Sequence, residues 1–266
     1  FIYNQKKGED KNTFVYRTHD LPDPEKVQNF AMFAKQFGHN LNLEEPAVSR
    51  SLNKLMEEVE GKPEQNVLQS LAVRAMAKAK YTTEAKGHFG LAFDHYTHFT
   101  SPIRRYPDMM VHRLLQHYLD GGKAMNKKEY EDKCLHSSER EKRAADAERA
   151  SIKYKQVEYM QNFLGDEFEG VISGVASFGF WVETVEHKCE GLVSIASLSE
   201  YDDFRHVETD YCLVGARSGR TFRMGDKVWI KVIAANLTKR QLDYEWVVAS
   251  GLKEKSEKSK GKKKKD

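Results

Sequence analysis

The chain has 266 residues, enough for one large domain or two of ordinary size, and its 39% hydrophobic content is sufficient for real cores. No stretch approaches the roughly 20 apolar residues of a membrane helix, and the amino terminus has no signal-peptide pattern, so we expect a globular, cytoplasmic protein without a membrane partner. The net charge is only +3, and the three cysteines (Cys134, Cys189 and Cys212) are too far apart to indicate a metal site or a disulfide framework.

The first clear element is a helix that begins at Asp23-Pro24. Aspartate is a good N-cap, proline suits the first helical position, and a one-sided apolar pattern then continues to Gly38. Similar apolar patterns predict two further helices, over residues 52–61 and 67–80. The residues before this region lack an initiator methionine and a clear start signal, so we expect the sequence to be a piece of a larger protein.

Two more helices are predicted in the middle of the chain. Pro107 can open the first of them, and the pair Gly121-Gly122 ends it. Ser138 with Glu141 three residues later has the pattern of a capping box, which predicts that the second helix begins at Ser138. The alanine-rich, charged run that follows favours a helix to about Leu164, with most of its charges facing solvent.

Beyond residue 165 the apolar pattern changes from helical to alternating. It predicts strands over residues 167–172, 178–185, 191–195, 227–234 and 241–248. Five strands are typical of an OB-fold barrel, in which glycines at positions 170, 174 and 179 suit turns and bulges. We therefore expect an α+β protein: a mainly helical domain over 1–165, a five-stranded OB-fold β-barrel over 166–250, and a tail over 251–266.

The predicted tail is strongly basic. Residues 253–266 hold eight lysines against three acidic residues. Such a run cannot bury apolar surface, so we expect it to be disordered and to attract polyanions through a salt-sensitive term that does not depend on their sequence. Many lysine-rich tails only aid solubility, and this alternative stays open.

The most informative stretch reads HFGLAFDHYTHFTSPIRRYPDMMVHR. In it, Arg104 and Arg105 directly precede the helix-opening Pro107, so two guanidinium groups are held near a helix amino terminus. Arginine forms bidentate hydrogen bonds with phosphate oxygens and stays charged at every physiological pH, which favours a phosphate-binding site. Alternatively, one arginine pairs with Asp94 or Asp108 as a structural ion pair, and the spacing does not decide between the two.

The same stretch resembles the final signature of the catalytic domain of RNB-family exoribonucleases. The likeness extends to YRTHDLPDPEKV at residues 16–27, which favours the ribonuclease R branch. This resemblance implies a mainly helical, carboxyl-terminal part of an RNB catalytic domain in a processive exoribonuclease. Such an enzyme degrades single-stranded RNA from a free 3′ end toward the 5′ end, releases nucleoside 5′-monophosphates, and uses Mg²⁺ held by aspartates.

The resemblance also implies roles for individual residues. Arg104 in SPIR matches the family arginine at the scissile phosphate, which makes it the candidate catalytic residue. Arg105, Ser101 and Tyr106 in the same run are candidate RNA contacts. Glu148, in AERA, matches a family glutamate that contacts the last nucleotides, so we expect it to bind RNA too.

The predicted barrel resembles the S1 RNA-binding domain through the runs FEGVISGVASFGFWVE and EGLVSIASL. In FGFWV, Phe178 and Trp181 match the two aromatic residues that stack on bases, a contact that tolerates any RNA sequence. Aromatic residues in strands also form cores, and Phe180 between them is a candidate for burial. Ser194 stands where the family often has histidine, which removes one stacking group.

The family's metal-binding aspartate cluster has no counterpart in the sequence. The adjacent pair Asp202 and Asp203 lies in a predicted barrel loop, where we expect surface positions. His88, His95 and His98 do not have the spacing of a zinc site, and we expect them to form hydrogen bonds within the fold. We therefore expect no metal ligands in this chain.

Two functions follow from different classes of protein. The chain is either part of an exoribonuclease that is inactive without its metal site, or a non-catalytic module that binds single-stranded RNA. A translation factor that uses the barrel is a third alternative, but it leaves SPIRRYPD unexplained. Structured RNA and the ribosome are further candidate partners, and we expect a monomer.

Overall fold

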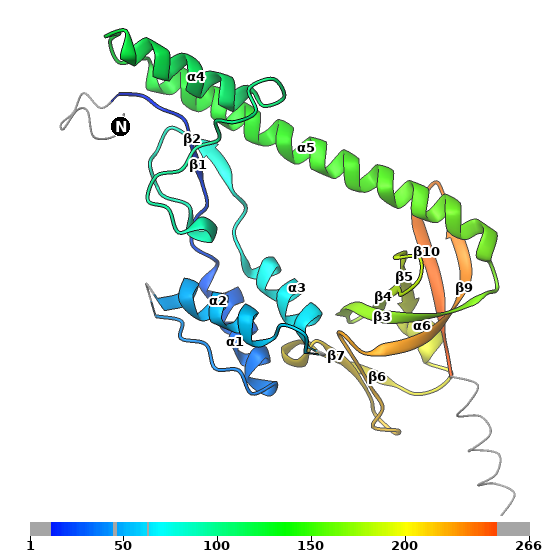
Figure 1. The fold of residues 1–266 in the computed structure, drawn as a ribbon. Coiled ribbons are helices and arrows are strands. Elements are labelled where there is room, and N and C mark those ends of the chain that lie inside the picture. Colours follow the sequence, from blue (N-terminus) through cyan, green and yellow to red (C-terminus); the bar gives the residue numbers. More distant parts are fainter. Residues whose placement is uncertain (1–11, 45–46, 63, 249–266) are drawn as a thin grey trace, which may run out of the picture. The chain divides into compact units, whose positions relative to one another are not determined.

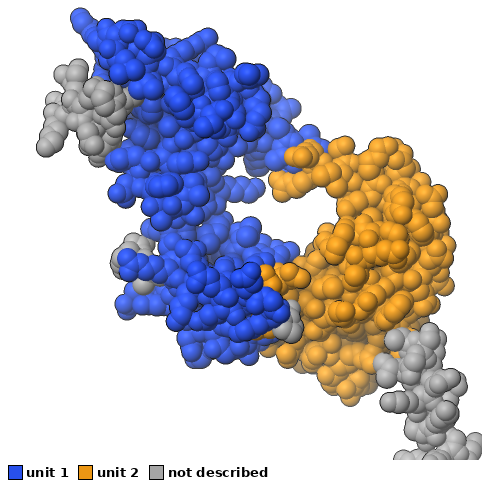
Figure 2. Space-filling model, viewed as in Figure 1, with its two compact units in different colours: residues 1–62, 68–147 blue, residues 63–67, 148–266 orange. Residues whose placement is uncertain are grey.

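The computed structural model describes residues 12–44, 47–62 and 64–248 (Figure 1). The chain divides into two compact units: residues 1–62 and 68–147 form the first unit, and residues 63–67 and 148–266 the second (Figure 2). The first unit is mainly helical and the second is built from strands, so the predicted α+β class is confirmed. A domain boundary near residue 165 stays a prediction, and the lysine-rich tail lies outside the described residues. No helix in the described ranges could cross a membrane.

The chain up to residue 160 forms a two-stranded antiparallel sheet and most of the helices. Its elements are β1 (Tyr16–Thr18), α1 (Pro24–Gln36), α2 (Ala47–Glu58), α3 (Gln65–Ala75), β2 (Lys80–Thr82), η1 (Phe89–Leu91), α4 (Tyr106–Leu119) and α5 (Lys127–Met160). The predicted start of α1 is confirmed, because the Asp23 carboxylate accepts hydrogen bonds from the backbone N–H groups of Glu25 and Lys26. Pro107 lies in the first turn of α4, as predicted.

The long helix α5 begins at Lys127, so the capping box predicted at Ser138 is wrong. The Asn126 side chain, 3.2 Å from the Glu129 backbone nitrogen, caps the helix instead. Ser138 lies inside α5, where its hydroxyl donates to the Cys134 carbonyl and accepts from the Tyr81 backbone N–H. Because the serine hydroxyl has these partners inside α5, it forms its hydrogen bonds without capping a helix start.

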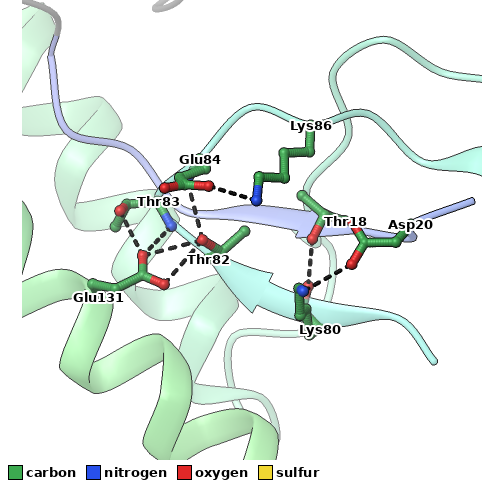
Figure 3. Close-up of polar contacts among 8 residues, drawn as sticks. All are labelled: Thr18, Asp20, Lys80, Thr82, Thr83, Glu84, Lys86 and Glu131. Atoms are coloured by element: carbon green, nitrogen blue, oxygen red, sulfur yellow. Dashed lines mark hydrogen bonds and ion pairs between the residues drawn. The ribbon is translucent and has the colours of Figure 1, made fainter. Parts of the chain in front are cut away.

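The β1–β2 sheet is bound to α5 by polar contacts along the helix (Figure 3). Glu131 accepts hydrogen bonds from the Thr82 hydroxyl at 3.0 Å and from the Thr83 backbone N–H at 2.6 Å. About three turns further along, Glu141 forms an ion pair with Arg17 at 2.6 Å. A buried apolar cluster supports these contacts; it consists of Phe14, Val15, Tyr16, Tyr81, Met110, Val111, Leu114, Tyr118, Tyr130 and Cys134.

The second unit contains a closed barrel in the order β10-β5-β4-β3-β9, which confirms the predicted five-stranded OB-fold. After η2 (Gln161–Phe163), its strands are β3 (Glu167–Ala176), β4 (Gly179–Thr184), β5 (Glu190–Ser194), β9 (Lys227–Asn236) and β10 (Gln241–Val247). The β3–β4 register shifts between Ile172 and Gly174, at one of the predicted glycines. Gly191 is required for another reason, because a Cβ there would lie 2.5 Å from the Tyr244 ring.

A three-stranded sheet between β5 and β9 was not predicted. After α6 (Ile195–Leu198) it comprises β6 (Phe204–Val207), β7 (Cys212–Gly215) and β8 (Thr221–Arg223), with η3 (Glu208–Asp210) between the first two strands. Asp202, expected at the surface, is only 2% exposed, whereas Asp203 is exposed as predicted. Asp202 is buried because it accepts hydrogen bonds from the Ser218 hydroxyl and the Ser218 backbone N–H, which hold the pKa of its carboxyl well below the usual range.

Replacing Glu131 tests the link between the β1–β2 sheet and α5. We expect Glu131→Gln to lower the free energy of unfolding by about 1–3 kcal/mol, because several donors lose a charged acceptor. Burial raises the pKa of Glu131, but the hydrogen bonds from Thr83 and Thr82 outweigh it and lower the pKa below 4.5. The contribution is therefore complete above pH 4.5 and is lost as the pH falls through the folded-state pKa.

Denaturant unfolding of wild type and Glu131→Gln between pH 3 and pH 7 measures this difference. Glu129→Gln is the matched control, because the Glu129 side chain is exposed and forms an ion pair with Lys133 on the same helix. A difference between wild type and Glu131→Gln that stays constant over this pH range would contradict the account.

Candidate nucleic-acid interface

The turn before α4, residues 101–108, is held together by one buried carboxylate. Asp108 is fully buried in the first turn of α4, and its Oδ2 accepts hydrogen bonds from the Ser101 backbone N–H and from Arg105 Nη2, both at 2.8 Å. The Ser101 carbonyl in turn accepts from the backbone N–H groups of Arg104 and Arg105, at 3.3 and 3.0 Å. These bonds fix the backbone on which both arginines stand.

The two arginines have different surroundings. The Arg105 side chain is 23% exposed and forms an ion pair with Asp108, so the structural ion pair left open by the sequence is present. Arg104 is exposed, and its guanidinium contacts the Ser101 hydroxyl at 3.3 Å. Tyr106, the first residue of α4, is 49% exposed beside them. Arg104 is therefore the arginine of this turn that can reach a phosphate in solvent.

The segment before the turn is anchored on two sides. The Tyr81 hydroxyl lies 2.8 Å from His98 Nδ1, and the Thr97 hydroxyl donates to the Val15 carbonyl at 2.8 Å. The ring of Phe99 stacks on His112 of α4, with centroids 4.0 Å apart. Sequence reasoning missed these supports because the partners lie on separate elements and no local spacing connects them.

The histidines near this turn serve the fold. Burial, together with the charges of Arg105 and Arg17, lowers the pKa of His98 and keeps its ring neutral at neutral pH. The hydrogen bond of His98 was predicted. His88 instead stacks on His19 at 5.1 Å, and its Nδ1 has no hydrogen-bond partner among the described residues, so the prediction is wrong for that nitrogen.

Glu148 lies on a different part of the chain from the turn before α4. Glu148 is exposed on α5, at the point where the second compact unit begins, whereas Arg104 belongs to the first unit.

Among residues 12–44, 47–62 and 64–248, no group of three or more His, Cys, Asp or Glu side chains could hold a metal ion. The described residues therefore do not fit a catalytic metal.

The barrel separates the aromatic residues of FGFWV between its two faces. Phe180 is fully buried in the core, as the sequence suggested, whereas Phe178 is 52% exposed and Trp181 is partly exposed. The rings of Phe178 and Trp181 meet edge to face, 5.3 Å apart and at 87°. Gly174 leaves room for the indole, because a Cβ there would lie 3.2 Å from Trp181. Phe178 and Trp181 thus form an exposed aromatic platform.

Ser194, which stands in place of the family's histidine, has a structural contact. It pairs with Gly179 across β4 and β5, and its hydroxyl accepts from the Ser197 backbone N–H at 3.2 Å to cap α6. A capping serine cannot stack on a base. The aromatic platform therefore consists of two rings, those of Phe178 and Trp181.

Comparison with known proteins relates both units to one kind of protein. Residues 4–121 match the RNB domain and residues 161–245 the S1 RNA binding domain. Ribonuclease R of Aquifex aeolicus is 41% identical over 236 residues, 88% of this chain and 33% of that protein. Ribonuclease R 1 of Lactococcus lactis is 40% identical over 240 residues, 88% of this chain and 29% of that protein.

Solved structures show the same similarity to ribonuclease R. Mycoplasma genitalium RNase R in its apo form has a TM-score of 0.81 at 26% identity, covering 89% of this chain and 38% of that chain. The same enzyme in complex with ribose methylated single-stranded RNA has a TM-score of 0.81 at 25% identity, with the same coverage. The chain spans about a third of the length of the curated relatives it matches.

Alanine variants of the two arginines test their different surroundings. We expect Arg105→Ala to lower the free energy of unfolding by about 2–4 kcal/mol, because it leaves the buried Asp108 carboxylate without its cation. Arg104→Ala is the matched control, and we expect a change within about 0.5 kcal/mol because the side chain is exposed. Urea unfolding measures both values, and equal losses in the two variants would contradict the account.

Proposed function

Because this chain belongs to the RNB family and carries an S1 RNA-binding domain, we propose that it serves a 3′-to-5′ exoribonuclease that degrades single-stranded RNA to nucleoside 5′-monophosphates. The observation that carries this proposal is the turn before α4. Its backbone is fixed by the buried Asp108, and it directs one exposed guanidinium, that of Arg104, into solvent.

Arg104 is the proposed catalytic residue. When a phosphodiester is hydrolysed, negative charge increases on the phosphoryl oxygens, and a guanidinium held in place before the reaction stabilises that charge. Ser101 and Tyr106 contact the RNA beside it, and Arg105 acts on the RNA through the turn that it stabilises with Asp108. Glu148 contacts the last nucleotides of the RNA.

The proposed cofactor is Mg²⁺, because hydrolysis by this family implies a divalent metal. The described residues offer no ligand cluster for it, so we assign its ligands to residues outside this chain and no catalytic step here depends on it. A cytoplasmic location and a monomeric state complete the proposal. The ribosome and structured RNA are further proposed partners.

The barrel is the proposed RNA-binding part. Stacking on Phe178 and Trp181 suits a nuclease without sequence preference, because every base has two aromatic faces. A related RNase R of Mycoplasma genitalium has been solved with single-stranded RNA, which supports this partner. The alternative is a non-catalytic module that binds single-stranded RNA, and the exposed platform favours binding in either case.

The platform predicts a loss of RNA affinity on truncation. We expect Phe178→Ala to weaken binding of single-stranded RNA by about 5- to 100-fold, because one stacked base is worth about 1–3 kcal/mol. Val185→Ala is the control, since Val185 is 42% exposed and directly follows the same strand, β4. Fluorescence anisotropy with a labelled oligonucleotide measures both, and equal affinities would argue against the platform.

Replacing Arg104 is predicted to lower the rate of RNA hydrolysis. In a protein of the relatives' full length that carries this chain, we expect Arg104→Ala to slow the hydrolysis of single-stranded RNA by about 10²- to 10³-fold, while RNA affinity changes only a few-fold. Arg113→Ala removes the same charge from an exposed position on α4 and is the control. Single-turnover rates measure the effect, and an unchanged rate for Arg104→Ala would exclude the catalytic assignment.

A further inference from the structure

A concave site lies in the strand-built unit, between β8 and the adjoining ends of β9 and β10. The cavity has a volume of about 350 Å³. The side chains that give it its chemical character are Arg220, Asp226, Lys227, Trp229, Trp246 and Val248. None of these residues belongs to the Phe178–Trp181 platform on β4, and β3 lies between β4 and β9 in the barrel.

Two tryptophans line the cavity in different ways. Trp246 is only 7% exposed, packs against Tyr201 and Phe222, and has the Arg220 guanidinium 4.6 Å above its ring. Trp229 is 43% exposed on the outer face of β9. The barrel core does not need an outward tryptophan, and a half-exposed indole beside a cavity is typical of a binding site.

The rim of the cavity carries charges of both signs, and Arg220 supplies its guanidinium. Arg220 is exposed, and Lys227, whose side chain is 72% exposed, contacts Glu169 at 3.1 Å. Asp226 is the acidic member of the lining, and its carboxylate accepts a hydrogen bond from the Arg223 backbone N–H. An aromatic wall next to the exposed Arg220 guanidinium matches a nucleotide, whose base stacks and whose phosphate is an anion.

The sequence that follows the last cavity-lining residue is also rich in positive charge. Val248 lines the cavity, and the run of eight lysines over residues 253–266 follows it a few positions later. The cavity-lining Val248 is therefore close in sequence to a second group of positive charges. This continuity favours a polyanion over an uncharged or cationic partner.

We propose that this cavity is a second subsite for single-stranded RNA, which takes one nucleotide with its base against Trp229 and its phosphate at Arg220. The proposal rests on the RNA binding proposed above and adds a second contact point on the barrel. It extends the RNA path beyond the platform on β4. Longer RNA therefore gains affinity that a very short oligonucleotide cannot.

The test is RNA affinity of the whole chain for a single-stranded oligonucleotide of about 12 nucleotides, within the site size of an OB-fold. We expect Trp229→Ala and Trp229→Leu to weaken binding about tenfold, and Trp229→Phe to restore it to within about threefold. Ile233→Ala is the control, because Ile233 is 50% exposed on the same face of β9 and outside the cavity. Thermal unfolding of each variant accompanies the titrations.

Trp229→Leu protects the test against misfolding, since it keeps an apolar side chain at this position but removes the aromatic face. The proposal is overturned if Trp229→Leu binds as tightly as Trp229→Phe. Arg220→Gln is expected to reduce the slope of log affinity against log salt by about one, and an unchanged slope removes Arg220 from the site. If Phe178→Ala weakens binding and the Trp229 variants do not, only this subsite fails. If neither affects binding, the RNA-binding function of the barrel fails as well.

Discussion

The first unit's candidate site depends on a single buried carboxylate. Asp108 has no contact with solvent, so its partners must come from the protein: its Oδ2 accepts hydrogen bonds from the Ser101 N–H and the Arg105 guanidinium, whereas its Oδ1 has no partner among the described residues. This requirement assigns the two adjacent arginines to different tasks. Arg105 neutralises Asp108 and fixes the turn, and the fixed turn exposes Arg104. A flexible loop with the same residues would have to be ordered for each phosphate that it binds, at a cost in conformational entropy.

In the second unit, two features achieve a similar separation. Strand alternation places Phe180 in the barrel core and Trp181 outside it, while Phe178 is exposed in the turn directly before β4. Gly174 lets the Trp181 ring lie close to β3, so the platform needs a glycine as well as two aromatic residues. In both units the groups proposed to contact RNA are exposed because a neighbour of similar chemistry already fulfils the structural requirement.

The parts of the structure that were predictable depend on local patterns. Asp23-Pro24 and the alternating barrel strands were sufficient to predict α1 and the closed barrel. The capping box at Ser138 failed because that hydroxyl bonds to Cys134 and Tyr81, and Tyr81 lies on another element. Strands β6 and β8 are four and three residues long, too short for alternation to be recognised. The Arg105–Asp108 pair stayed undecided because burial of Asp108 depends on tertiary packing.

The described residues offer exposed groups for the proposed RNA binding and phosphate contact, but no cluster of metal-ion ligands. The most direct test is to incubate the chain with a single-stranded RNA that has a free 3′ end and with Mg²⁺, and to measure binding and release of nucleoside 5′-monophosphates together. The account predicts salt-sensitive binding without release of monophosphates. Magnesium-dependent release by this chain alone would contradict it, because the residues described here would then contain a metal site that their positions do not provide.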